Sequence, residues 1–174
     1  VMWAQVDNYF EKLKEDLDSI YYASYFSEFA SYLTRENNDE MQILKLLYQT
    51  LRALEKKTMP NELIRLVYEI KLMAVYGLGM EAFQCVRCGS KEQLVGFEPA
   101  EGGTVCASCG GGRFPAGPST IYALQYILYS PIERLYTFRV SREVQKELKK
   151  ITEEFLKVHI QHEFKSKIFL PQES

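Results

Sequence analysis

The residues whose types and spacing most directly indicate chemistry in this chain are its cysteines. Two C-x2-C pairs, separated by 17 residues, hold all of them: Cys85, Cys88, Cys106 and Cys109. This spacing is typical of a tetrahedral zinc site, in which each short turn directs two sulfurs at one ion. Gly89 and Gly110 follow the two pairs, where a tight turn favours a residue without a Cβ.

We predict one structural Zn²⁺ per chain, bound by these four cysteines. Two disulfides are the alternative in a secreted protein, and a redox centre is the alternative for a single C-x-x-C beside a βαβ pattern. Neither an export signal nor a βαβ pattern is visible in the sequence. A catalytic zinc ion is disfavoured because four cysteines leave no open position for water or substrate. We therefore expect a cytoplasmic protein whose metal stabilises the fold.

The composition indicates an ordinary globular domain, with 47% hydrophobic and 25% charged residues. A net charge of −2 provides no overall basic field for nucleic acid. No apolar run approaches the roughly 18 residues of a membrane span, so we expect no membrane partner. Because a helical pattern begins almost at Val1, we also expect this sequence to be part of a longer protein.

Hydrophobic periodicity predicts the elements that must position the cysteines. We expect a first helix over residues 6–33, a second over 43–54 with Asn38 or Asp39 as its N-cap, and a third from Pro60 to Gly77. A short helix capped by Ser119 or Thr120 and ended by Pro131 follows the cysteines, and a last helix runs over residues 141–162.

Between the third and fourth helices, residues 93–97 and 104–106 are expected to form short strands joined by a glycine-bearing turn. The fold class predicted is therefore mainly α, with a small four-cysteine zinc ribbon inserted into a helical domain. The helical domain comprises residues 1–84 and 111–170, and the insert comprises residues 85–110.

Three further patterns have two readings each. The aromatic stripe over residues 20–33 is expected to be helix–helix core, with an apolar peptide groove as the alternative. The last helix carries Arg142, Lys146, Lys149 and Lys150 opposite its apolar face, which is a solvated surface or a phosphate-contacting stripe. His159 and His162 are expected to serve in packing or capping, with metal binding as the alternative, although no third ligand is apparent nearby. Without a nucleophile elbow, H-E-x-x-H or P-loop, we predict no enzyme.

Several stretches together resemble one known family. They are "YYASYFSEF" (21–29), "ILKLLYQTLRAL" (43–54), "LVYEIKLMAVYGLG" (66–79), "CVRCG" (85–89), "GGTVCASC" (102–109) and "FKSKIFL" (164–170). In order and spacing, over nearly the whole chain, they resemble the C-terminal part of the RecO family of bacterial recombination mediators in DNA repair. Members of that family begin with an OB-fold domain, to which nothing in this sequence is similar.

The resemblance implies a cytoplasmic, nucleoid-associated protein that binds single- and double-stranded DNA and anneals complementary strands. It implies that the protein acts together with RecR and helps to load RecA. It also implies that the helical domain binds the acidic, apolar C-terminal tail of the single-strand-binding protein. The candidate cations for that tail are Arg52, Arg65 and Lys71. The candidate DNA contacts are Arg142, Lys146, Lys149, Lys150, Lys165 and Lys167, with weak binding expected without the OB-fold.

A zinc-ribbon module of the transcription or translation machinery, which binds RNA or a polymerase subunit, is the alternative function. The four-cysteine pattern fits such a module equally well. The roughly 80 helical residues before the first cysteine favour the mediator.

Overall fold

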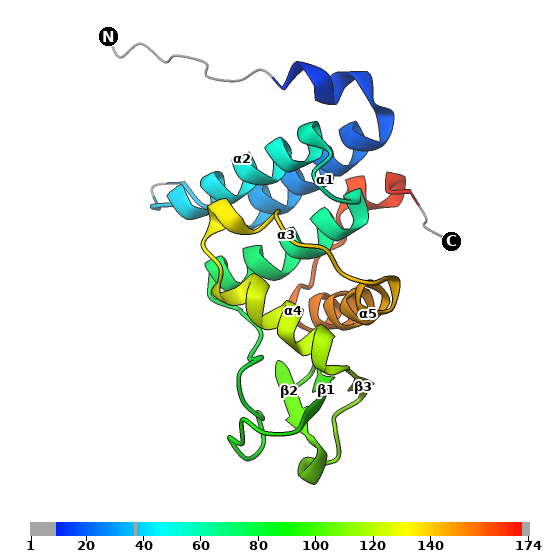
Figure 1. The fold of residues 1–174 in the computed structure, drawn as a ribbon. Helices are drawn as coiled ribbons and strands as arrows, with labels where there is room; N and C mark the ends of the chain where they lie inside the picture. The colour runs from blue at the N-terminus through cyan, green and yellow to red at the C-terminus, as the bar shows by residue number, and fades with distance from the viewer. Residues whose placement is uncertain (1–9, 37, 172–174) are drawn as a thin grey trace.

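The computed structural model describes residues 10–36 and 38–171, which form a helical body with a small sheet at one end (Figure 1). The helices are α1 (Leu17–Leu33), α2 (Met41–Lys56), α3 (Asn61–Tyr76), α4 (Pro118–Tyr129) and α5 (Arg142–His159). The strands are β1 (Leu94–Glu98), β2 (Gly103–Cys106) and β3 (Phe114–Pro115). Four short 3-10 turns are η1 (Glu11–Glu15), η2 (Ala107–Cys109), η3 (Ile132–Arg134) and η4 (Lys165–Phe169). The predicted fold class, mainly α with a small cysteine-bearing insert, is confirmed.

The expected first helix is wrong in its extent, because Asp16 divides it into η1 and α1. Asp16 has an extended backbone (φ −124°, ψ 114°), and its carboxylate accepts a hydrogen bond from the hydroxyl of Ser19. A residue with a short polar side chain that bonds its own following turn favours a helix start over a helix interior. Residues 6–9, which the prediction included, lie outside the described residues.

The ends of the remaining helices agree with the sequence to within a few residues. α3 begins after Pro60 and ends at Gly77, whose left-handed backbone (φ 98°) terminates the helix as predicted. α4 begins at Pro118, so Ser119 and Thr120 lie inside its first turn and do not cap it. At α5 the hydroxyl of Ser141 accepts a hydrogen bond from the N–H of Val144 at 3.3 Å, and the helix ends three residues earlier than expected.

The sheet has the strand order β2-β1-β3, and both pairs are antiparallel. The predicted hairpin of β1 and β2 is confirmed. β3 lies beyond residue 110, so the sheet extends into a segment that the sequence assigned to the helical domain. We call residues 85–115 the ribbon. Gly96 is required at its centre, because a Cβ there would lie 1.7 Å from the carbonyl oxygen of Gly111.

One continuous hydrophobic core joins the helices and reaches into the ribbon through Phe97. The aromatic stripe of α1 lies in this core, as the packing reading predicted, with Tyr22, Tyr25, Phe26 and Phe29 buried. The segment after α5, residues 160–170, returns to α1 (Figure 1). We call it the C-terminal segment. Within the described ranges, no helix combines the length and apolar content that crossing a bilayer requires.

Candidate metal centre and the charged groups behind it

The four cysteines come together at one end of the ribbon. Their sulfur atoms all lie within 4.8 Å of one another, and the Sγ atoms of Cys88 and Cys106 are 3.6 Å apart. Four sulfurs at about 2.3 Å from a tetrahedral ion would be separated by roughly 3.8 Å. The donor set and its spacing therefore fit a closed, four-coordinate metal site. Among the described residues, this is the only such group of metal-binding side chains.

Each cysteine pair lies in a tight turn that the sequence dictates locally. The N–H of Gly89 donates to the carbonyl of Cys85 at 2.8 Å, and the N–H of Cys85 donates to Ser90 at 2.7 Å. Gly89 and Gly110 have left-handed backbones (φ 74° and 89°), which explains why glycine follows each pair. The predicted role of these glycines is confirmed.

The thiols differ in their readiness to ionise. Hydrogen bonding, first from the backbone N–H of Cys106 and also from those of residues 87 and 88, lowers the pKa of Cys85 to about 6. Sulfur contacts with Cys88 and Cys106 raise the pKa of Cys109 to about 12. A bound dication would favour the thiolate form of every ligand.

Arg87, inside the first cysteine pair, connects the two halves of the ribbon. Its Nε lies 2.9 Å from a carboxylate oxygen of Glu101 in the hairpin turn, and its Nη1 donates to the carbonyl of Cys109 at 2.7 Å. These contacts hold both cysteine turns against the hairpin and leave the cysteine sulfurs free for a metal.

Contacts with α4 and α5 hold the ribbon and the segment that leads into it. The rings of Phe97 and Phe155 pack edge to face with centroids 6.3 Å apart. The Nε2 of His159 lies 3.0 Å from the carbonyl oxygen of Pro99, and the side-chain amide of Gln125 donates to Ala82 at 2.8 Å. His159 therefore serves in packing, as expected. α5 and α4 together fix the orientation of the ribbon.

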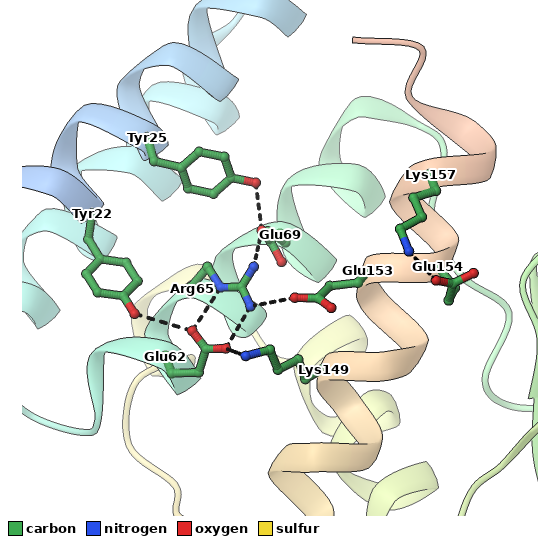
Figure 2. Close-up of polar contacts among 9 residues, drawn as sticks. All are labelled: Tyr22, Tyr25, Glu62, Arg65, Glu69, Lys149, Glu153, Glu154 and Lys157. Carbon is green, nitrogen blue, oxygen red and sulfur yellow. Dashed lines mark hydrogen bonds and ion pairs between the residues drawn. The ribbon is translucent and has the colours of Figure 1, made fainter. Parts of the chain in front are cut away.

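A buried cluster of charged groups lies between α3 and α5 (Figure 2). The guanidinium of Arg65 contacts Glu62 at 2.7 Å, Glu69 at 3.3 Å and Glu153 of α5 at 3.2 Å. The ammonium of Lys149 contacts Glu62 at 2.9 Å. Two tyrosines of α1 complete the cluster, with Tyr22 donating to Glu62 and Tyr25 to Glu69 (Figure 2). Ion pairs between α3 and α5 and hydrogen bonds from α1 hydroxyls therefore link three helices in the interior.

Pairing favours the charged forms of Glu62 and Arg65 despite their burial. Burial disfavours the charge of Glu62, but hydrogen bonds and charge from Arg65 and then Lys149 outweigh it and hold the pKa of Glu62 below its usual range. Burial likewise disfavours the cation of Arg65, and the opposing charge of Glu69, with Glu62, raises its pKa overall. One oxygen of Glu69 remains buried without a hydrogen-bond partner in the described structure.

The structure places the three candidate partner-binding cations in different surroundings. Arg65 is 3% exposed, and its guanidinium contacts carboxylates of the buried cluster. Lys71 is 8% exposed and donates to the carbonyls of Leu128 and Ser130, both at 2.8 Å. Arg52 is half-buried, with its guanidinium 5.8 Å from the ring centre of Tyr48. Of the three candidates, Arg52 alone reaches the surface.

The candidate DNA contacts do not form one stripe. Arg142, Lys146 and Lys150 are exposed on α5, whereas Lys149 is half-buried against Glu62. Lys165 and Lys167 lie in the C-terminal segment and line a hollow of about 1130 Å³ beside the end of α5. The structure thus separates the predicted set into a group at the start of α5 and a pair near its end.

The C-terminal segment is itself fixed to α1. The carboxylate of Glu28 accepts hydrogen bonds from the backbone N–H groups of Lys165 and Ser166, both at 2.9 Å, and from the Ser166 hydroxyl. These bonds lower the pKa of Glu28, with the Ser166 hydroxyl as the first cause. The C-terminal segment, which lines the hollow, is therefore fixed to α1 by these hydrogen bonds.

Comparison with known proteins identifies the family. A family model described as "Recombination protein O C terminal" matches residues 14–168. The DNA repair protein RecO of Thermoanaerobacter sp. (strain X514) is 29% identical over 163 residues, which cover 92% of this chain and 66% of that protein. The DNA repair protein RecO of Bacillus subtilis (strain 168) is 28% identical over 163 residues, which cover 92% and 64%. The chain spans about two thirds of the length of these curated relatives. Since the family model covers both the helices and the cysteine ribbon in one continuous match, this chain belongs to the RecO family and corresponds to its C-terminal part.

Proposed function

We propose that this chain is the helical and metal-binding part of a DNA repair protein that acts as a recombination mediator and has no catalytic activity of its own. The observation that carries the proposal is the match of residues 14–168, which includes all five helices and the four cysteines. The similar proteins from Thermoanaerobacter and Bacillus are named DNA repair proteins. This continuous match disfavours an isolated ribbon of the transcription or translation machinery.

The metal in this proposal is one structural Zn²⁺ held by Cys85, Cys88, Cys106 and Cys109. Structural zinc is commonly held by four thiolates in tetrahedral geometry. The ion would cross-link the two cysteine turns and would take no part in a reaction. Metal analysis of the purified chain should find one zinc ion per molecule, and Cys106→Ser should abolish retention of zinc and lower the yield of soluble protein. Four titratable thiols without bound metal would contradict this part.

The complete protein is proposed to bind single- and double-stranded DNA, to anneal strands, and to load RecA together with RecR at the nucleoid. The part described here is proposed to receive the acidic, apolar tail of the single-strand-binding protein. The hollow of about 1130 Å³ supports this role, because apolar side chains of Leu156, Ile160 and Phe164 line it together with Lys165 and Lys167. An apolar anchor and nearby cations are what such a tail requires.

Calorimetry of this chain with a tail peptide tests the proposal. Micromolar affinity, about −8 kcal/mol, is expected from one buried anchor and one or two charge-assisted contacts. Lys165→Ala with Lys167→Ala should weaken binding, whereas Lys91→Ala, an exposed lysine of the ribbon, serves as the matched control. Absence of heat and of competition at high micromolar peptide, with a folded chain, would contradict the proposed role.

A further inference from the structure

Tyrosines line the outer side of α4 in a way that burial does not explain. Tyr122 is 69% exposed and Tyr129 is 85% exposed. With half-buried Tyr126 they occupy positions i, i+4 and i+7 of one helix, so the three side chains lie on the same side. We call these three residues the tyrosine face. Aromatic rings left this open to water, in a row, are available to stack with a ligand.

A hollow of about 640 Å³ lies beside the tyrosine face, between α4 and the segment that leads into α5. Tyr122 and Tyr126 line it on one side, and Phe138 and Arg139 line it on the other. The rings of Tyr126 and Phe138 pack with centroids 4.9 Å apart, and the Tyr126 hydroxyl donates to the carbonyl of Arg134 at 3.1 Å. Because these contacts hold Tyr126 in place, the hollow has a fixed aromatic wall.

Among the described residues, one cation without an ion pair lines the same hollow, and three more lie nearby in the sequence. Arg139 lines it, and the exposed cations Arg134, Arg142 and Lys146 come from neighbouring positions of the chain. In the part of the chain that the structure describes, no ion pair joins any of these four cations to a carboxylate. By contrast, Lys149 and Lys157, farther along α5, are paired with Glu62 and Glu154.

The carboxylates near this surface are mostly occupied elsewhere. Glu133 pairs with Lys45 of α2. Glu147 accepts hydrogen bonds from the Gly117 N–H at 2.9 Å and from the Thr120 hydroxyl at the start of α4. Glu143 remains as an exposed acid among four cations. The surface therefore combines open aromatic rings with a local excess of positive charge.

We propose that the tyrosine face, with Arg139 and Arg142, binds single-stranded DNA. Unpaired bases stack on the tyrosine rings, and the arginines contact the phosphates between them. An anionic polymer with exposed aromatic bases satisfies both features of the surface, which a neutral apolar peptide would not. The choice of DNA as the nucleic acid rests on the proposed function in DNA repair. The inference places the strand on α4, away from the paired lysine of the predicted stripe and from the hollow beside the C-terminal segment.

Fluorescence anisotropy with labelled oligo(dT) and with a labelled duplex tests the assignment on the intact chain. Tyr122→Ala together with Tyr129→Ala should weaken oligo(dT) binding at least about fivefold, the lower end for one lost base stack. Duplex binding should stay unchanged, because paired bases are not available for stacking. Replacement of both residues by Phe should preserve binding, since the ring faces remain.

Two further variants separate stacking from charge and from general surface effects. Tyr76→Ala, which removes a partly exposed tyrosine of α3, is the matched control and should leave both affinities unchanged. Arg139→Ala should weaken single-strand and duplex binding alike and reduce the salt dependence of each by about one phosphate contact. An abasic strand of the same length should bind the unaltered chain about as weakly as oligo(dT) binds the double alanine variant.

Three results would overturn the inference: no binding of oligo(dT) by the folded chain, equal binding by the double alanine variant, or equal binding of abasic and oligo(dT) strands. The second or third would leave the tyrosine face as a contact for a protein partner. These outcomes are distinct from failure of the proposed function, which depends on the tail peptide. If the chain binds the peptide but its binding of oligo(dT) does not depend on the tyrosines, the proposed function stands and the site on the tyrosine face is contradicted.

Discussion

At the scale of single residues, Arg65 is the central cation of the buried charged cluster. Its guanidinium contacts carboxylates from two helices while 3% exposed. Replacing a buried ion pair as a whole can be neutral, but removing one partner leaves the others charged in a medium that solvates them poorly. The cluster is therefore sensitive to the loss of its central cation.

Arg65→Met should lower the free energy of unfolding by about 3–5 kcal/mol, because Glu62 and Glu69 lose the cation that compensates them. Urea denaturation at pH 7 measures the change. The matched control is Arg52→Met, since Arg52 is half-buried over Tyr48 and should cost less than about 1 kcal/mol. Equal stabilities for Arg65→Met and the unaltered chain would contradict the role assigned to the cluster.

Glu62 should contribute a pH dependence to stability. Its folded pKa lies below its unfolded value of about 4.3, so its stabilising effect is present above that pH and is lost as the pH falls through the folded pKa. Unfolding free energies of the unaltered chain and of Glu62→Gln should therefore differ most above about pH 5 and converge in acid. A constant difference from pH 7 to pH 3 would contradict this, because it would mean that folding does not shift the pKa of Glu62.

The sequence predicts the metal ligands far better than it predicts which charged side chains are buried and paired. Each cysteine turn is formed by residues close together in the sequence. The C-x2-C spacing with a following glycine therefore predicts most of the geometry of the metal site. The environment of Arg65 depends on Glu153, 88 residues away, and that of Lys71 depends on backbone carbonyls 57 and 59 residues away. No local pattern distinguishes a buried, paired cation from an exposed one on the same helix. The i, i+4, i+7 spacing of the α4 tyrosines was visible, but periodicity alone does not say which side faces water.

At the scale of elements, α5 joins the parts of the molecule. Lys149 and Glu153 reach the charged cluster, Phe155 and His159 hold the ribbon, and the end of the helix lines the hollow beside the C-terminal segment. Its periodicity and its Ser141 cap made the start of this helix predictable, whereas its end lies three residues earlier than expected. The division of the first helix at Asp16 and the two-residue strand β3 were missed, because each depends on contacts of one or two residues that periodicity does not detect.

Phe155→Ala should destabilise the chain by about 3–5 kcal/mol and also accelerate loss of metal from the ribbon. The ring of Phe155 packs on Phe97 of β1, so its removal opens a cavity at the junction between helix and hairpin. Denaturation and the rate of metal transfer to a chelator report the two effects. Val158→Ala, at a position 48% exposed on the same helix, is the control and should change neither by much.

Metal release that is unchanged in Phe155→Ala, despite the loss of stability, would show that α5 supports the helical core alone. The ribbon would then hold its metal without help from the helices.

At the scale of the whole molecule, the ribbon has almost no core of its own. The buried residues confined to it are Cys85, Val105 and Cys106, whereas the helices share one extensive core. A structural zinc site contributes about 10–16 kcal/mol of apparent binding free energy, more than so few apolar side chains can provide. With the proposed zinc ion bound, the ribbon would be stabilised mainly by its metal and the helices mainly by their core.

Removal of the metal by a chelator should unfold the ribbon and leave most of the helical content in place. Hydrogen exchange followed by mass spectrometry should show fast exchange over residues 85–112, while α1, α2 and α3 remain protected. Far-ultraviolet circular dichroism provides the independent measure of helix content. Simultaneous loss of protection in all helices would show instead that the metal stabilises the entire domain.

The contact between Glu28 and the backbone of residues 165 and 166 links positions 137 and 138 apart in the chain. During synthesis on a ribosome, α1 is made long before the segment that covers Phe29 with Phe164. At a synthesis rate of roughly 5–20 residues per second, several seconds or more would pass between the synthesis of α1 and that of the segment that packs on it. A nascent chain stalled before residue 164 therefore leaves Tyr25, Phe29 and Tyr32 without the ring that contacts them in the complete chain, and such shortened products should bind chaperones that the complete chain does not need.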